Sequence, residues 1–295
     1  MSAMPGPRLP FIFVATRLQD VPCRRFVSVD GSVPGAALVW DHHLTGEPIN
    51  LDAMPEFADL SGFDGIGTTM ADTDAVASVV AALAGGKGAL EPGVRRVLEA
   101  ASHRCDHLTP LPGADPELDR LGLGLHAWIS RALVQERPFA QVCREVAAAR
   151  PLPFLDPAEE AATAGDLRAE GRLDPTGPVA LVDLRGHDPV APHLLYAQHR
   201  CPVQVLVEDH PAGGRRYVVG VHPDAADAQD LSPALRALAM AEFAHGAPAR
   251  SPEPVPGAEN WGGRRTVFGS PFNYGSRLEV AEVRALVVRA LGLHA

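Results

Sequence analysis

Short apolar runs alternate with longer helical segments through the first half of the chain, and this alternation limits the fold more than any other feature. Four runs have the length of strands, the last of them rich in glycine: residues 11–15, 25–29, 36–40 and 65–70. Apolar residues at helical spacing, with helix start and stop signals, predict helices at residues 74–84, 93–101, 118–134 and 139–149. We therefore predict an α/β fold with a mostly parallel sheet flanked by helices.

The second half of the chain is richer in β signals. Strands are predicted at residues 179–184, 203–208 and 217–221, and the glycine-containing stretch at 210–214 predicts a hairpin between the last two. Helices follow at 232–244 and 280–291. We divide the chain into an α/β domain at 1–150, a linker rich in Pro, Glu and Gly at 151–178, and a smaller α/β domain at 179–295.

The charge of the chain bears on its ligands. The formal net charge is −10, whereas a protein that follows a long phosphate backbone usually carries a broad basic surface. A short oligonucleotide or a single nucleotide is thus favoured as a partner over long duplex nucleic acid.

Cysteine spacing and hydropathy exclude other classes of protein. The four cysteines form no C-x-x-C pair, which argues against a zinc ribbon or a dense disulfide framework. No run approaches the 18 apolar residues of a membrane helix, and the start of the chain lacks the apolar core of a signal peptide. We expect a cytoplasmic protein that does not bind membranes.

One strand candidate ends at an acid and two imidazoles, Asp41, His42 and His43. A buried strand would deliver these side chains to the carboxyl edge of the sheet, where open α/β folds bind ligands. Carboxylate and imidazole donors suit Mn²⁺, Fe²⁺ or Zn²⁺. The alternative is a surface turn with two solvated histidines.

Further acids follow the ends of other predicted elements. Asp72 and Asp74 stand before a helix; one acid there is usually an N-cap, but two separated by one residue exceed what capping needs. Asp106 follows another helix, and Asp30 ends its own strand. Hydrolysis of a phosphate ester often uses two metal ions, which require several carboxylates and imidazoles. These residues provide enough carboxylates and imidazoles for a site with two metal ions.

A glycine-rich segment at residues 262–269 offers backbone N–H groups to an anion, and Arg264 and Arg265 add forked donors that fit phosphate oxygens. A tight turn between two strands explains the same glycines equally well.

Taken together, these motifs resemble the DHH (Asp-His-His) phosphoesterase superfamily. Asp41–His42–His43 is similar to the namesake motif, and residues 72–78 are similar to the family's D-x-D-x-x-x-S motif. Residues 105–111 resemble the segment in which a late metal-binding aspartate precedes a Leu/Pro run. Gly262–Gly263–Arg264 resembles the Gly-Gly-His loop of the associated C-terminal domain.

The resemblance implies a metal-dependent phosphoesterase in which a metal-activated water attacks the phosphoester of a short oligonucleotide, dinucleotide or small nucleotide. The implied cofactor is a divalent metal, Mn²⁺ by preference, and a homodimer is left open. The implied metal ligands are Asp41, His42, Asp72, Asp74 and Asp106. The implied catalytic residues are His42, His43 and Asp74, and the implied substrate-binding residues are Gly262, Gly263, Arg264 and Arg265.

The chain departs from the family pattern in ways that keep other hypotheses open. Asp41 precedes Asp72, the reverse of the usual motif order; Thr68 stands where the family places a metal-binding His, and Arg264 replaces the loop His. A catalytically degenerate nucleotide-binding or regulatory relative is therefore the alternative function. An unrelated α/β protein, in which these acids lie far apart, is the third hypothesis.

Overall fold

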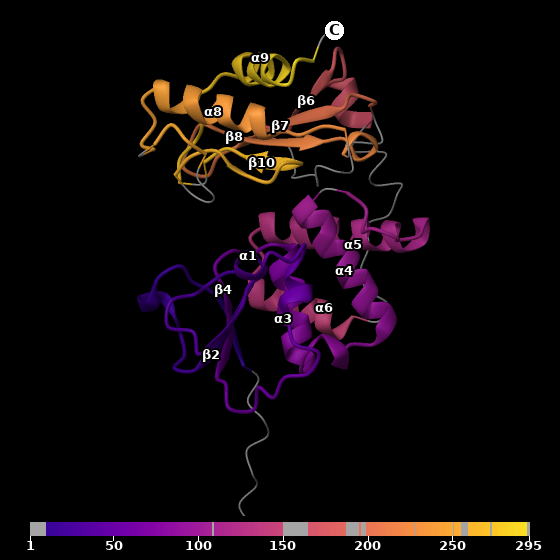
Figure 1. Ribbon diagram of the computed structural model, residues 1–295, viewed down its shortest axis with the longest axis vertical. Helices are drawn as coiled ribbons and strands as arrows, with labels where there is room; N and C mark the ends of the chain where they lie inside the picture. Colours follow the sequence, from indigo (N-terminus) through magenta and orange to yellow (C-terminus); the bar gives the residue numbers. More distant parts are fainter. Residues whose placement is uncertain are drawn as a thin grey trace, which may run out of the picture. The chain divides into compact units, whose positions relative to one another are not determined.

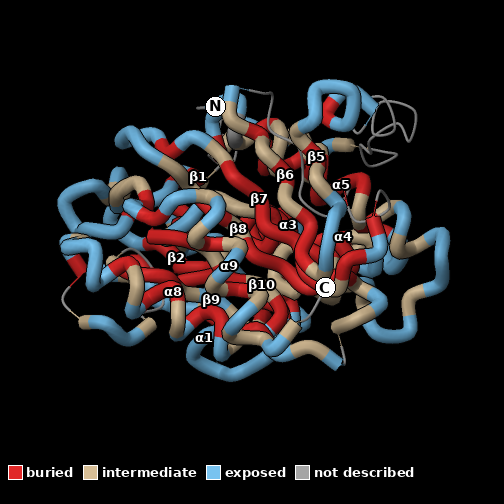
Figure 2. The backbone as a smooth tube through the Cα atoms, turned by 90° about the horizontal axis from the view of Figure 1, so that it is seen from above, coloured by how far each residue is buried: buried red, intermediate tan, exposed pale blue. Residues whose placement is uncertain are grey.

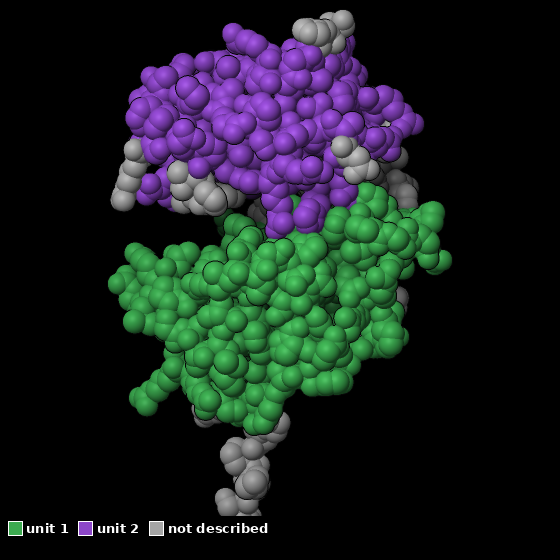
Figure 3. Space-filling model, viewed as in Figure 1, with its two compact units in different colours: residues 1–106, 110–155 green, residues 107–109, 156–295 purple. Residues whose placement is uncertain are grey.

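The structure is a computed structural model that describes residues 10–107, 109–149, 165–186, 195, 199–226, 228–249, 251–254, 259–271 and 273–293. The chain forms two compact units, which Figure 3 shows in separate colours. Residues 1–106 and 110–155 make up the first, and residues 107–109 and 156–295 the second. Residues 151–164 of the predicted linker lie outside the described residues. The domain boundaries drawn from the sequence stay a prediction.

The first unit is built on a four-stranded parallel sheet in the order β1-β4-β2-β3; Figure 1 labels two of the strands, β2 and β4. Its strands are β1 (Phe11–Val14), β2 (Phe26–Val29), β3 (Leu38–Trp40) and β4 (Gly65–Thr68). Strand β4 needs glycine because the ring of Phe13 on β1 lies over it: a Cβ at Gly67 would come within 2.7 Å of that ring. Parallel pairing places the carboxyl ends of all four strands at one edge.

Six α-helices belong to this unit among the residues described. They are α1 (His42–Thr45), α2 (Asn50–Ala53), α3 (Thr73–Ala84), α4 (Pro92–His107), α5 (Pro116–Val134) and α6 (Phe139–Ala148). Short 3₁₀ turns lie at Leu18–Asp20 and Lys87–Ala89.

Helix α3 is the centre of the first core. Ten of its residues are buried, and the red colour of α3 in Figure 2 shows this. Its side chains are mostly Ala and Val, so the helix can approach the sheet closely on one side and α5 and α6 on the other. Asp72 caps its start by accepting a hydrogen bond from the backbone N–H of Ala75, and Gly85 ends it in the left-handed conformation.

Strand β3 differs from the buried strand predicted for residues 36–40. It lies at the edge of the sheet, and Leu38 and Val39 are 43% and 38% exposed. Periodicity cannot separate a short apolar edge strand from a central one, because both read as uninterrupted apolar runs. The carboxyl end of the strand still delivers Asp41 and His42 to the sheet edge.

The second unit contains a mixed six-stranded sheet in the order β5-β6-β7-β8-β10-β9. Its strands are β5 (Leu173–Asp174), β6 (Val179–Asp183), β7 (Val203–Asp209), β8 (Arg215–Val221), β9 (Gly262–Gly263) and β10 (Val267–Gly269). Strands β7 and β8 form the predicted antiparallel hairpin. Helices α8 (Ser232–Ala244) and α9 (Val280–Ala290) pack together over this sheet (Figure 1), and a 3₁₀ turn lies at Pro223–Ala225.

The predicted fold class is confirmed: a parallel sheet flanked by helices, followed by a second α/β unit with a mixed sheet. Among the residues described, no helix is long and apolar enough to cross a membrane.

Candidate metal centre

The acids predicted to converge do meet at the carboxyl edge of the first sheet. Asp30 follows β2 directly, His42 begins the short helix after β3, and Asp74 lies in the first turn of the helix after β4. Asp106 comes from the last turn of α4. A carboxylate at a helix C-terminus is unfavourable by about 0.3–1 kcal/mol, so the helix gains no stability from Asp106 there.

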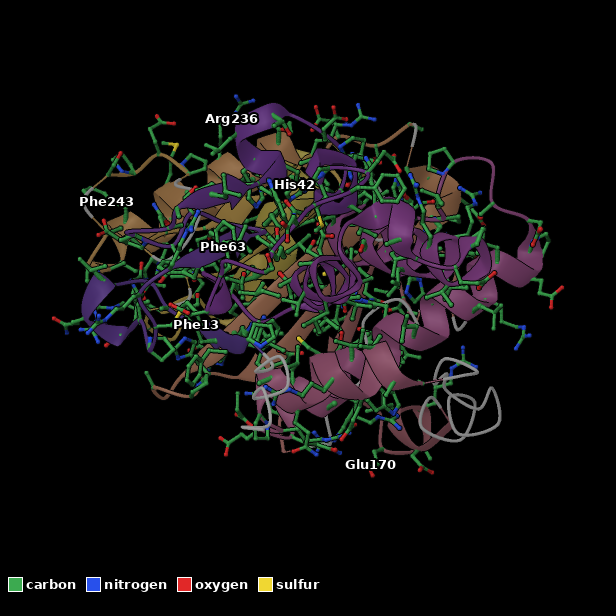
Figure 4. All side chains as sticks on the ribbon, turned by 90° about the horizontal axis from the view of Figure 1, so that it is seen from below. Phe13, His42, Phe63, Glu170, Arg236 and Phe243 are labelled. Carbon is green, nitrogen blue, oxygen red and sulfur yellow. The ribbon has the colours of Figure 1, made fainter. Side chains whose placement is uncertain are left out.

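His42 lies at the middle of this cluster (labelled in Figure 4). Its Nε2 atom is 3.4 Å from a carboxylate oxygen of Asp30, 3.5 Å from one of Asp106 and 3.7 Å from one of Asp74. The side chain of His42 is 1% exposed and that of Asp74 is fully buried. Three acids from three segments therefore surround one imidazole nitrogen away from water.

The other ring nitrogen of His42 fixes the chemistry of Nε2. Nδ1 lies 3.2 Å from the backbone carbonyl oxygen of Glu47. A carbonyl oxygen only accepts hydrogen bonds, so Nδ1 carries the proton, and in the neutral ring the Nε2 lone pair faces the three carboxylates. A histidine held by a backbone carbonyl in this way is the usual arrangement for a metal ligand.

The spacing of these atoms fits a divalent cation. With metal–ligand bonds of about 2.1 Å, neighbouring ligands lie roughly 3.0–3.4 Å apart in octahedral or tetrahedral sites. The oxygens at 3.4–3.7 Å from Nε2 are close to these separations and longer than a good hydrogen bond. His42 belongs to two groups of potential metal ligands: one also contains Asp30 and His43, and the other Asp74 and Asp106. The donor set is compatible with a divalent cation.

Charge repulsion in the cluster is strong. Burial, with the charges of Asp72, Asp74 and Asp106, raises the pKa of Asp30 well above its usual value. Burial also raises the pKa of Asp72 to about 6. The two carboxyl groups share a hydrogen bond that favours the protonated form of Asp30 and the ionised form of Asp72. Without a cation, the cluster thus retains a proton that a metal ion would displace.

Asp30 adopts a backbone conformation that is rare for a side-chain-bearing residue, with φ at +47°. The hydroxyl of Thr68, at the end of β4, lies 2.9 Å from the backbone carbonyl oxygen of Asp30 and 3.0 Å from that of Met70. Thr68 thus helps to hold the turn that presents Asp30. Strain of this kind persists where surrounding contacts fix it, often at functional sites.

Asn50 connects the segment that carries His42 with the segment that carries Asp74. Its backbone N–H donates to an Asp74 carboxylate oxygen, and its side-chain oxygen accepts from the backbone N–H of His42, both at 2.9 Å. Its side-chain amide donates to the hydroxyl of Ser78, also at 2.9 Å. Asn50 and Ser78 are fully buried. This residue, which the sequence analysis did not identify, thereby sets the separation of His42 and Asp74.

The structure brings some predicted ligands together and leaves others apart. Asp41 caps α1, accepting from the backbone N–H of His43 at 2.9 Å, and its second oxygen lies 3.2 Å from the Ser32 hydroxyl. It belongs to neither group of potential ligands found among the described residues. Asp72 caps α3 and contacts Asp30. The roles of Asp41 and Asp72 as metal ligands stay predictions.

His43 differs from His42 in its exposure. Its side chain is 62% exposed, its ring lies 4.1 Å from that of His42 between centroids, and its Nε2 is 3.9 Å from an Asp30 oxygen. This position allows a solvent-borne ligand to reach His43 beside the buried acids.

The predicted substrate-binding segment is a tight hairpin in the second unit. Strands β9 and β10 pair antiparallel, and the backbone N–H of Arg264 donates to the Val267 carbonyl across the turn. Gly263 has φ at +147°, and a Cβ there would lie 2.5 Å from the backbone of Phe268. Close packing therefore accounts for this glycine. Arg264 is half-buried and Arg265 exposed, and binding of substrate by Gly262, Gly263, Arg264 and Arg265 stays a prediction.

Comparison with known proteins identifies no family for the chain. No family model matches the chain, and no curated protein matches it. Among solved structures, the chain is similar to a pGpG-specific phosphodiesterase, PggH from Vibrio cholerae, at 11% sequence identity. The match covers 91% of this chain and 83% of that chain, with a TM-score of 0.44. At this level of similarity, the chemistry of the site stands on its own residues.

Proposed function

We propose that the chain is a metal-dependent phosphoesterase of the DHH type, with its metal centre at the carboxyl edge of the first sheet. Asp30, His42, Asp74 and Asp106 would hold a divalent cation, Mn²⁺ by preference, and Asp72 would complete the centre. The observation that carries this proposal is the buried Nε2 of His42, within 3.7 Å of three carboxylates while Nδ1 is held by a backbone carbonyl.

Each residue has a role that follows from its position. A bound divalent ion would supply an activated water and would neutralise charge on a phosphoester. His43, exposed beside Asp30, would donate a hydrogen bond to a phosphate oxygen. Arg264 and Arg265, with Gly262 and Gly263, would bind another part of the substrate. Hydrolysis forms a new P–O bond to the attacking water and breaks the ester P–O bond; the attacking water loses a proton to solvent, and the leaving oxygen takes one from solvent or from a protonated His43.

The substrate class follows from charge and from the family resemblance. A chain with a net charge of −10 is poorly suited to binding along a long nucleic acid. The positive charge of a bound divalent cation would be enough to bind one or two phosphate groups. We therefore propose a short oligonucleotide, a dinucleotide or a small nucleotide with a terminal phosphate as substrate.

The test combines metal binding with turnover. Isothermal titration with Mn²⁺, and an assay with linear dinucleotides and with bis-phosphorylated adenosine, should show binding and phosphate-ester cleavage in the wild type. Asp74→Asn removes a charge from the cluster and should abolish both. Absence of Mn²⁺ binding in the wild type would refute the proposal.

A matched variant assigns the role of Asp41. Asn caps helices as well as Asp does, so Asp41→Asn preserves the start of α1 while it removes the charge. Retention of metal affinity within about 3-fold would make Asp41 a cap. A loss as large as that of Asp74→Asn would make it a ligand.

Thr68 favours a second candidate function, a catalytically degenerate nucleotide-binding relative. Its hydroxyl lies against the Asp30 and Met70 carbonyls, at the position where the resemblance implies a ligating His. Metal content after purification without chelator, measured together with turnover, separates the candidates: bound Mn²⁺ with turnover favours the enzyme. Nucleotide binding without turnover, with one Mn²⁺ or none per chain, favours the degenerate relative.

A further inference from the structure

A histidine outside the predicted motifs contacts the residue between Asp72 and Asp74. His126 lies in α5, and its Nδ1 is 2.8 Å from the hydroxyl oxygen of Thr73. His126 is 6% exposed and Thr73 is 1% exposed. Thr73 stands between Asp72 and Asp74 in the chain and is the first residue of α3. The contact therefore reaches the residue that links Asp72 to Asp74 in the chain.

We propose that His126 is a positioning residue, which holds Thr73 through this hydrogen bond and so aims the Asp72 and Asp74 carboxylates into the metal centre. The inference rests on the proposed function insofar as it names a metal centre. The positioning itself is a property of the metal-free protein and can be measured there.

Capping of α3 does not require this contact. Asp72 already supplies the cap by accepting from the N–H of Ala75 at 2.9 Å. An apolar side chain at position 126 would also pack in the core, without the free-energy cost of burying a polar imidazole. The hydrogen bond to Thr73 compensates that cost and at the same time fixes the backbone between the two acids.

The contact is insensitive to pH across the physiological range. Burial, with the nearby positive charge of Arg104, lowers the pKa of His126 to about 3. Arg104 is itself held by Asp119 at 2.7–3.0 Å, so this charge has a fixed place between α4 and α5. His126 therefore stays neutral and differs in this from a histidine that takes part in proton transfer.

Isosteric variants separate positioning from packing. His126→Leu and Thr73→Val each remove one partner of the hydrogen bond. His126→Asn places an amide near the position of Nδ1, and Thr73→Ser keeps the hydroxyl. We expect Mn²⁺ affinity to fall about 10–100-fold in the first two variants and to stay within about 3-fold in the conservative pair. The double variant His126→Leu/Thr73→Val should bind Mn²⁺ with no lower affinity than the weaker-binding of the two single variants.

A second measurement needs no metal. The backbone N–H of Ala75 reports the place of the Asp72 carboxylate that accepts from it. In metal-free protein, hydrogen exchange at Ala75 should be about 10-fold faster in His126→Leu and Thr73→Val than in the wild type. It should be unchanged in Ser130→Ala, which removes only a hydroxyl 3.5 Å from Nε2 of His126.

The remaining control is a variant that loses stability without losing the hydrogen bond between His126 and Thr73. Val142→Ala creates a core cavity on α6, which carries neither partner of the hydrogen bond, and should lower the melting temperature without changing Mn²⁺ affinity or Ala75 exchange. The inference is overturned if folded His126→Leu and Thr73→Val bind Mn²⁺ and exchange Ala75 as the wild type does. It is also overturned if Val142→Ala reproduces their effects. A wild type that binds no Mn²⁺, but whose Ala75 exchange follows the prediction, would refute the proposed function alone.

Discussion

The crowding of acids at the candidate centre predicts that Asp72→Asn makes the metal-free protein more stable at neutral and alkaline pH. The pKa of Asp72 is raised to about 6, chiefly by burial, whereas the same group in the unfolded chain ionises near 3.8. The folded state therefore holds a proton more tightly than the unfolded state, and ionisation costs folding free energy as the pH rises. Asn cannot ionise and still caps α3.

The size of the effect follows from that difference of about two pKa units. One unit corresponds to 1.36 kcal/mol, so the cost of ionising Asp72 is at most about 3 kcal/mol above pH 6. The side chain is half-buried and solvent screens part of the repulsion, so we expect about 1.5–3 kcal/mol. For a unit of this size, that is a rise of roughly 3–12 °C in melting temperature.

Thermal unfolding with chelator present, from pH 4 to pH 8, measures the effect. Wild type should lose stability as the pH rises from about 4 through 6, and Asp72→Asn should lose less. Asp115→Asn is the matched control, because Asp115 caps α5 by the same kind of hydrogen bond but lies outside the cluster. Saturating Mn²⁺ should reverse the order, since it stabilises only a protein that binds it. Equal or lower stability of Asp72→Asn at pH 8 without metal would refute the electrostatic reasoning.

Two further predictions concern the contacts of the centre. Asn50→Ala should weaken Mn²⁺ binding about 10–100-fold, because it releases the backbone of His42. Ser78→Ala should have a smaller effect, which disappears when Asn50 is already Ala. Titration calorimetry of the wild type, the two single variants and the double variant measures this, and additive losses of affinity would contradict it. Mn²⁺ binding near pH 6 should release at least one proton, because Asp30 retains one in the metal-free cluster. Calorimetry in buffers of different ionisation enthalpy measures the number of protons released. Binding without proton release would contradict the hydrogen bond that Asp30 and Asp72 share.

The elements of the fold could be predicted because their local signals agree. The helix predicted at 74–84 is α3 at Thr73–Ala84, and its start and end carry the expected Asp and Gly caps. The hairpin predicted around 210–214 follows from its turn residues. The edge position of β3 could not be predicted, because strand order depends on contacts distant in sequence.

The site was predicted in its residue types more than in its geometry. His42, Asp74 and Asp106 meet as potential ligands, and Asp30, which is not among the metal ligands that the resemblance implies, lies closest to His42 Nε2. Asn50 carries no sequence signal: a single amide beyond the Asp-His-His motif looks like any loop residue. His126 equally looks like a core histidine of α5, and only the distance to Thr73 distinguishes it.

The atypical order of the motifs does not prevent a common site, for a reason that lies in the parallel sheet. Each of β2, β3 and β4 ends at the same edge whatever its place in the chain. The acid after β2, the imidazole after β3 and the acid after β4 therefore converge regardless of which segment comes first. Convergence depends instead on which strands are neighbours, and β2 lies between β4 and β3. Asp30, directly after this middle strand, accordingly lies beside both His42 and the Asp72–Asp74 pair, so a rearranged order keeps the potential ligands together.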